Sequence, residues 1–72
     1  MDSETLRFIR TSSNLSVREF ATKINVSHSL ISRIEGGDRR LTDRVRRMIM
    51  VTFGLTEEKL VAIKLLINEI KN

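Results

Sequence analysis

Apolar residues recur with the period of an α-helix in the segment 17–24. They occupy positions i, i+3, i+4 and i+7, which is the pattern of a helix with one buried face: Val17, Phe20, Ala21 and Ile24. Ser16 stands before this segment and Glu19 follows it by three residues, which predicts a capping box at the helix start. Only Asn25 and Val26 separate this helix from Ser27, the expected N-cap of the next one.

Caps and glycines predict the other boundaries. Ser3 is the expected N-cap of a first helix, and the glycine pair at 36–37 ends the third. Thr42 caps a fourth helix that Gly54 closes, and a fifth helix is expected over about 57–71. No repeat or linker interrupts the chain. We therefore predict one all-α domain of five helices over residues 1–72.

The two short helices around Asn25 form the predicted functional unit. Helices joined by a tight turn cross steeply, and Ala21 provides the small side chain that a close approach of their backbones requires. The apolar seam between them consists of Phe20, Ala21, Ile24, Val26, Ile31 and Ile34. With this seam turned inward, four hydrogen-bonding side chains remain outside: His28, Ser29, Ser32 and Arg33. We predict a helix-turn-helix over about 16–36, with recognition helix 27–35 in the DNA major groove.

The distribution of charge supports a polyanionic partner. Residues 1–54 hold ten Lys and Arg against six Asp and Glu, whereas residues 55–72 hold three of each. The segment 33–47 contains six arginines and no lysine. Arginine suits bidentate contact with phosphate or guanine, although a solvated charged face is the alternative. The residues expected on DNA phosphates are Ser27, Arg39, Arg40, Thr42 and Arg44.

The motif resembles the Cro/CI-type (Xre-family) helix-turn-helix. The residues Leu15-Ser16-x-x-x-Phe20-Ala21 carry this resemblance, followed by Val-Ser-His-Ser-Leu-Ile-Ser-Arg-Ile-Glu-Gly-Gly at 26–37. The resemblance covers about residues 6–60, and it includes the short members of this family that phages or mobile elements encode. Two positions depart from the family pattern: Val17 stands where a polar residue is usual, and Asn25 stands where a glycine is usual.

The resemblance implies a lambda-repressor-like fold and a role for several residues. His28, Ser29 and Arg33 fall at base-contacting positions. Arg10 and Glu35 fall where many members pair the first helix with the end of the recognition helix. The implied function is a homodimeric repressor on a palindromic operator of double-stranded DNA, without a cofactor or metal, in the cytoplasm of a bacterial or phage-infected cell.

The fifth helix has more apolar residues than one packing face requires. One face collects Leu60, Ala62, Ile63, Leu66, Ile67 and Ile70, and Val61 and Leu65 form a separate ridge. We predict a dimer interface drawn from Val61, Leu65, Ile63, Ile67 and Ile70, without deciding which face meets the partner. Alternatively, Val61 and Leu65 are scattered surface residues or cover Phe8.

Other function classes receive less support. The same helix would suit a protein-interaction module, such as an antitoxin or anti-repressor. With one histidine and no cysteine, and without a phosphate-binding glycine loop, we expect no enzyme. The apolar stretch 60–67 contains Lys64 and is too short to span a bilayer, and residues 1–4 do not resemble a signal peptide.

Overall fold

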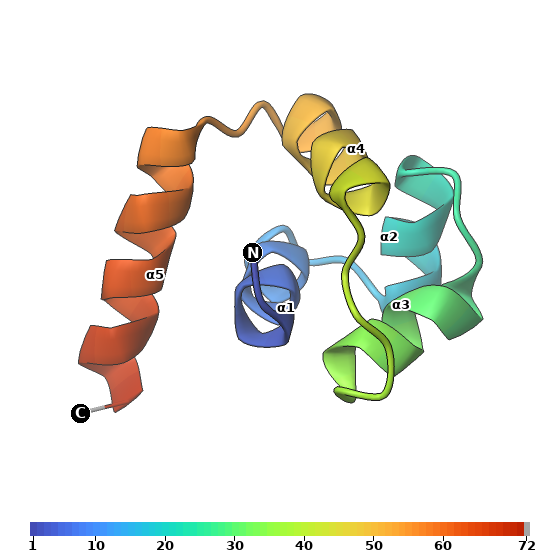
Figure 1. Cartoon of the computed structure of the whole chain (residues 1–72), viewed down its shortest axis with the longest axis horizontal. Helices are drawn as coiled ribbons and strands as arrows, with labels where there is room; N and C mark the ends of the chain where they lie inside the picture. The colour runs from blue at the N-terminus through green and yellow to red at the C-terminus, as the bar shows by residue number, and fades with distance from the viewer. Residues whose placement is uncertain (72) are drawn as a thin grey trace.

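The computed structural model describes residues 1–71, and this part of the chain contains five α-helices and no strand. Their bounds are α1 Ser3–Ser12, α2 Val17–Lys23, α3 His28–Glu35, α4 Asp43–Phe53 and α5 Glu57–Lys71. Along the longest axis of the molecule, α5 lies at one end and α2 and α3 lie at the other (Figure 1). The predicted all-α, five-helix architecture is confirmed. No helix among residues 1–71 is long and apolar enough to cross a membrane.

The N-caps of α2, α3 and α4 form as the sequence predicts. At α2 the Glu19 amide donates to Ser16 Oγ at 3.1 Å, and the Ser16 amide donates to Glu19 Oε1 at 2.9 Å, which completes the capping box. Ser27 and Thr42 cap α3 and α4 through their hydroxyl oxygens, which accept from the amides of Leu30 and Val45. These local bonds satisfy amides that have no partner within the helix.

The first helix begins one residue earlier than predicted, because Asp2 and not Ser3 is its N-cap. The Asp2 carboxylate accepts from both the amide and the hydroxyl of Thr5, at 2.9 and 2.7 Å. These bonds favour the ionised form, and they hold the pKa of Asp2 below its ordinary value. Thr5 is itself buried, so packing selects the cap that can satisfy its hydroxyl.

The predicted seam is the centre of the hydrophobic core. Five of its six residues are buried, and Val26 is half-buried. The remaining buried apolar residues come from α1, α4 and the first turn of α5: Leu6, Ile9, Val45, Ile49 and Leu60. Phe20 stacks on Phe53 of α4, with ring centroids 5.2 Å apart. One hydrophobic cluster therefore joins α2 and α3 to α1, α4 and the first turn of α5.

Asn25 makes the turn between α2 and α3 in the left-handed conformation, with φ of 59°. Asparagine tolerates this region better than most residues that carry a Cβ. The absence of the usual glycine therefore leaves the turn intact.

The packing face of α5 is narrower than its sequence predicts. Leu60 is buried and Ile63 and Ile67 are half-buried, but Leu66 and Ile70 are 45% and 69% exposed. The reason is that α5 packs against α1 alone over most of its length, and one neighbouring helix covers only a narrow stripe.

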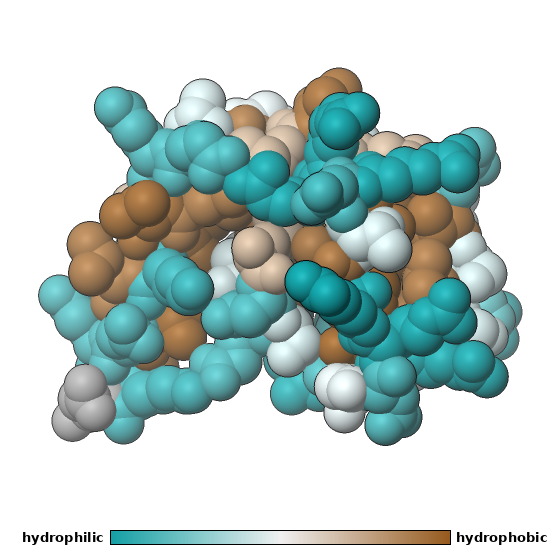
Figure 2. Space-filling view, viewed as in Figure 1, coloured by the Kyte–Doolittle hydropathy of each residue, from teal (hydrophilic) through white to brown (hydrophobic). Residues whose placement is uncertain are grey.

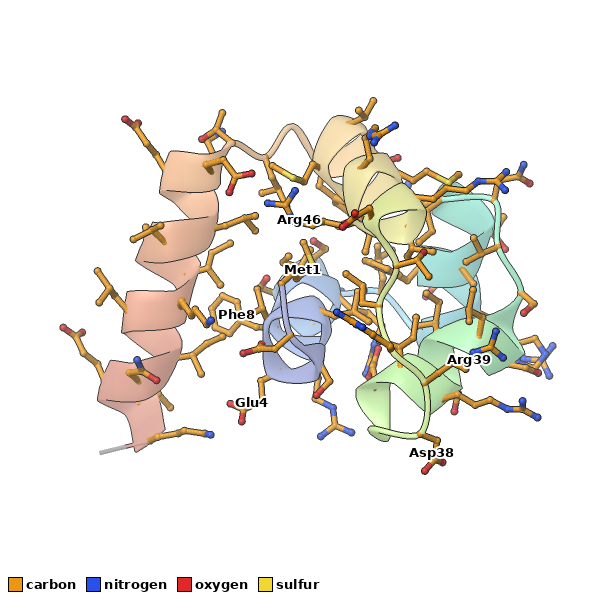
Figure 3. All side chains as sticks on the ribbon, in the orientation of Figure 1. Met1, Glu4, Phe8, Asp38, Arg39 and Arg46 are labelled. Carbon is orange, nitrogen blue, oxygen red and sulfur yellow. The ribbon has the colours of Figure 1, made fainter. Side chains whose placement is uncertain are left out.

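Val61 and Leu65 do not cover Phe8, so this alternative is wrong. They remain 60% and 61% exposed. Phe8 points from α1 toward α5 (Figure 3), where Ile67 and Ile70 line the same hollow of about 500 Å³. The exposed apolar surface of α5 is thus larger than the two-residue ridge expected from the sequence.

Candidate nucleic-acid interface

The outer face of α3 presents all four residues predicted to contact bases. Ile31 and Ile34 are buried, with exposures of 0% and 2%, so they fix which side of the helix faces the core. The opposite side carries four exposed side chains: His28, Ser29, Ser32 and Arg33. Ser29 and Arg33 lie one helical turn apart and therefore project side by side. The face is polar along its whole length, with hydrogen-bonding groups suited to base edges.

The loop after α3 brings a second arginine to this face. Arg39 lines a shallow hollow of about 340 Å³ together with Ser29 and Arg33. The amides of Asp38 and Arg39 both donate to the Arg33 carbonyl, at 2.9 and 3.2 Å, so the loop folds back onto the helix end. Arg39 reaches from this loop toward α3 (Figure 3). The structure therefore joins Arg33 and Arg39 in one cationic surface.

The other predicted phosphate-contacting residues do not all join that surface. Arg40 lines a polar hollow of about 480 Å³ that also includes Arg39 and the first residues of the chain. Arg44 instead faces a separate hollow between α2 and α4. The arginines that the sequence groups together are thus distributed over different sides of the α4 N-terminus.

The two capping hydroxyls keep a hydrogen-bond donor. Ser27 Oγ accepts from the Leu30 amide at 3.2 Å, and Thr42 Oγ1 accepts from the Val45 amide at 3.3 Å. A hydroxyl that accepts one bond still has its own proton to donate. Both residues are exposed, so both O–H groups are accessible to a phosphate.

Arg10 and Glu35 form a bidentate ion pair between α1 and the end of α3. Arg10 Nε lies 2.6 Å from Glu35 Oε2, and Nη2 lies 2.9 Å from Oε1. The remaining Arg10 Nη1 donates to the Leu15 carbonyl at 3.0 Å. The Glu35 side chain is only 4% exposed, and its hydrogen bonds raise the pKa of Arg10. This geometry positions α3 against α1.

Two further arginines take part in contacts that the sequence analysis missed. Arg7 Nε lies 3.5 Å from Glu35 Oε1, so the carboxylate has a second cation nearby. The spacing of Arg7 and Arg10, three residues on one helix, is the signal that could have revealed it. Arg46 forms an ion pair with Glu57 at the start of α5. This pairing depends on where α5 lies, which no local pattern specifies.

The helix-turn-helix domain family matches residues 3–62, which is most of the chain. The protein belongs to this family. Comparison with curated proteins and with solved structures finds no match. The matched segment includes the whole of the α2–turn–α3 unit, and membership of a helix-turn-helix family indicates DNA as the partner. The described residues hold no group of three or more His, Cys, Asp or Glu side chains placed to bind a metal ion.

Proposed function

We propose that this helix-turn-helix protein is a sequence-specific transcriptional regulator of the Cro/CI (Xre) type that inserts α3 into the major groove. The outer face of α3 carries this proposal. Its apolar residues are all turned inward or half-buried, and His28, Ser29, Ser32 and Arg33 are left exposed together. A solvated helix face needs no such set of short hydrogen-bonding residues around one arginine, whereas a base-reading face does.

Arg33 is the main base-reading residue in this proposal. A guanidinium recognises guanine O6 and N7 with two parallel hydrogen bonds. Ser29, one turn away, approaches the neighbouring base or phosphate, and His28 and Ser32 extend the contact along the groove. The pair Arg10–Glu35 positions α3 without touching DNA, because the Glu35 carboxylate is almost completely buried.

Phosphate contacts supply most of the affinity and depend on salt. The proposed contacts are Ser27, Arg39, Arg40, Thr42 and Arg44. All five are exposed, and the two hydroxyl residues stand at the N-termini of α3 and α4. A helix N-terminus attracts phosphate through its free amides and its dipole.

We further propose a homodimeric repressor of phage or mobile-element type acting on a palindromic operator. The resemblance of the motif at 26–37 supports the type. The exposed apolar residues of α5 support self-association, because a small domain rarely leaves so much apolar surface to water: Val61, Leu65, Leu66 and Ile70.

Selection of binding sites from random duplex DNA tests the proposal. We expect one palindrome whose half-site centres lie about 34 Å apart. Arg33→Ala should cost about 1–3 kcal/mol and relax the preference at one base pair in each half-site. Arg40→Ala is the matched control, because it should weaken binding to all sequences alike and reduce the salt slope by about 1. Equal affinity for the selected and scrambled duplexes would refute base reading by α3.

The exposed surface of α5 also favours a second function, a protein-interaction module such as an antitoxin or anti-repressor. In that case a different protein covers the surface formed by Val61, Leu65, Leu66 and Ile70. Stoichiometric co-purification of such a partner, without retention of DNA, would identify this function. Retention on the selected palindrome in the absence of any partner would exclude it as the sole function.

A further inference from the structure

A second apolar surface lies between α2 and α4, away from the outer face of α3. This hollow, which we call the α2–α4 hollow, has a volume of about 400 Å³. Its apolar lining comes from Ile24, Met48 and Val51. Val51 is 77% exposed, the highest value among the large apolar residues of the described chain. An apolar side chain this exposed beside a hollow marks a contact surface.

All the charged residues that line the α2–α4 hollow are cationic: Lys23, Arg44 and Arg47. The neutral side chains of Asn25 and Thr52 complete the polar part of the lining, and no acidic residue lines the hollow. Within residues 1–71 none of the three cations forms a salt bridge. An apolar floor with a cationic rim fits an amphipathic helix that carries acids beside its apolar side chains.

Such a helix is present in the same chain. Along one side of α5, Glu58, Val61, Leu65 and Glu69 follow one another at spacings of three and four residues. We call this stripe the α5 ridge. All four residues are exposed, and neither glutamate forms a salt bridge within residues 1–71. Figure 2 shows apolar side chains gathered over α5. The ridge therefore has an apolar centre with an acid at each end.

We propose that the α5 ridge of one copy docks in the α2–α4 hollow of a second copy. Val61 and Leu65 contact Ile24, Met48 and Val51, and the two glutamates meet Lys23 and Arg47, the two cations of the hollow that are not proposed to contact DNA. This contact rests on the homodimer proposed above, and it identifies the surface of the second copy to which α5 binds.

Charge disfavours the simpler pairing of two α5 helices through the same ridge. In a parallel pair each glutamate would face its own counterpart. In an antiparallel pair centred between Val61 and Leu65, Glu69 would face Glu57 of the other copy and Glu58 would face Asn68, so neither ridge glutamate would lie opposite a cation. Like charges placed opposite one another at an interface oppose association. The α2–α4 hollow instead offers the glutamates two cations, Lys23 and Arg47.

The placement of the two surfaces suits a twofold pair. The α5 helix lies at one end of the longest axis, and α2 lies toward the other end (Figure 1). In the pair that we propose, the two copies lie antiparallel and each α5 docks in the α2–α4 hollow of the other, so the same contact forms twice. Such an interface is isologous, since each copy contributes both surfaces.

Complementary charge reversals test the contact by sedimentation velocity without DNA. We expect Lys23→Glu/Arg47→Glu and Glu58→Arg/Glu69→Arg each to weaken self-association at least about tenfold, because each places like charges in contact. An equimolar mixture should restore association as a one-to-one heteropair. The heteropair contains two contacts. In one contact the charges of both the hollow and the α5 ridge are reversed, so they attract each other again, and in the other contact both surfaces are wild-type. Neither variant alters a residue proposed to contact DNA.

Arg18→Glu is the matched control, because Arg18 is an exposed α2 residue outside the hollow and its substitution should leave association unchanged. Circular dichroism melts check that each variant is folded, and recovery in the mixture itself excludes misfolding as the cause of the loss. Three results would overturn the proposal: a monomeric wild-type chain at every concentration, wild-type association of the hollow variant, or no recovery in the mixture. Because no DNA is present, none of these outcomes depends on operator binding.

Discussion

Glu35→Gln removes the charge that holds α3 against α1 while keeping the size of the side chain. In the wild-type chain the Glu35 carboxylate accepts from Arg10 at 2.6 and 2.9 Å. The Arg10 side chain is only 15% exposed, so the variant leaves a mostly buried guanidinium without its counter-charge. The Leu15 carbonyl and the single amide oxygen of the new glutamine remain as neutral acceptors. Breaking one side of such a pair should cost about 3 kcal/mol, since the remaining charge is poorly solvated.

This loss is large relative to the stability of a small domain. A chain of 72 residues has a free energy of unfolding of about 4–11 kcal/mol. For a domain of this size, a loss of about 3 kcal/mol lowers Tm by about 12–24 °C. Thermal and urea unfolding followed by far-ultraviolet circular dichroism would measure both quantities.

Glu57→Gln is the matched control, because Glu57 also pairs with an arginine but its side chain is 72% exposed. That substitution should cost less than about 1 kcal/mol. The double variant Arg10→Met/Glu35→Met should unfold within about 1 kcal/mol of wild-type, since apolar residues replace a buried pair without leaving a charge. If Glu35→Gln costs no more than Glu57→Gln, the pair does not hold α3 in place.

Two further substitutions test the local structure around α1 and α2. Asn25→Ala should destabilise the domain by about 1 kcal/mol, since the left-handed conformation with φ of 59° is less favourable for alanine than for asparagine. Urea unfolding measures this loss of stability. The control is Asn68→Ala on the exposed side of α5, which should cause no loss of stability. The pKa of Asp2 is lower in the folded protein than the ordinary carboxyl pKa. The ionised Asp2 carboxylate therefore stabilises the fold fully above the ordinary carboxyl pKa, and this stabilisation is lost as the pH falls through the pKa of the folded state. Asp2→Asn keeps the cap without titrating, so its urea midpoint should fall less than that of wild-type between about pH 5 and pH 3; a parallel decline would contradict this role.

Features determined within a few residues of sequence were predictable. The capping box at Ser16 and Glu19 depends on two side chains three residues apart, and the left-handed turn at Asn25 depends on one. The inward face of α3 follows from helical periodicity alone, so the positions of Ile31 and Ile34 also set the outer face that we propose to read DNA.

Features that depend on which helices become neighbours were predicted less well. Ser3 and Asp2 are both good capping residues, and the burial of Thr5 decides between them. The exposure of Leu66 could not be read from α5, because it depends on how much of that helix α1 covers. A helical wheel gives the direction of a side chain but does not identify what lies opposite it.

The arginines of segment 33–47 show why a charge count is a poor measure of a binding surface. In the sequence they form one basic cluster, but the fold separates them. Arg33 and Arg39 share the surface of α3, Arg44 and Arg47 rim the α2–α4 hollow, and Arg46 pairs with a glutamate of α5. Only cations that release counterions from DNA contribute to its salt-dependent binding. The same net charge therefore serves two different surfaces, because α4 divides the segment between the outer face of α3 and the hollow beside α2.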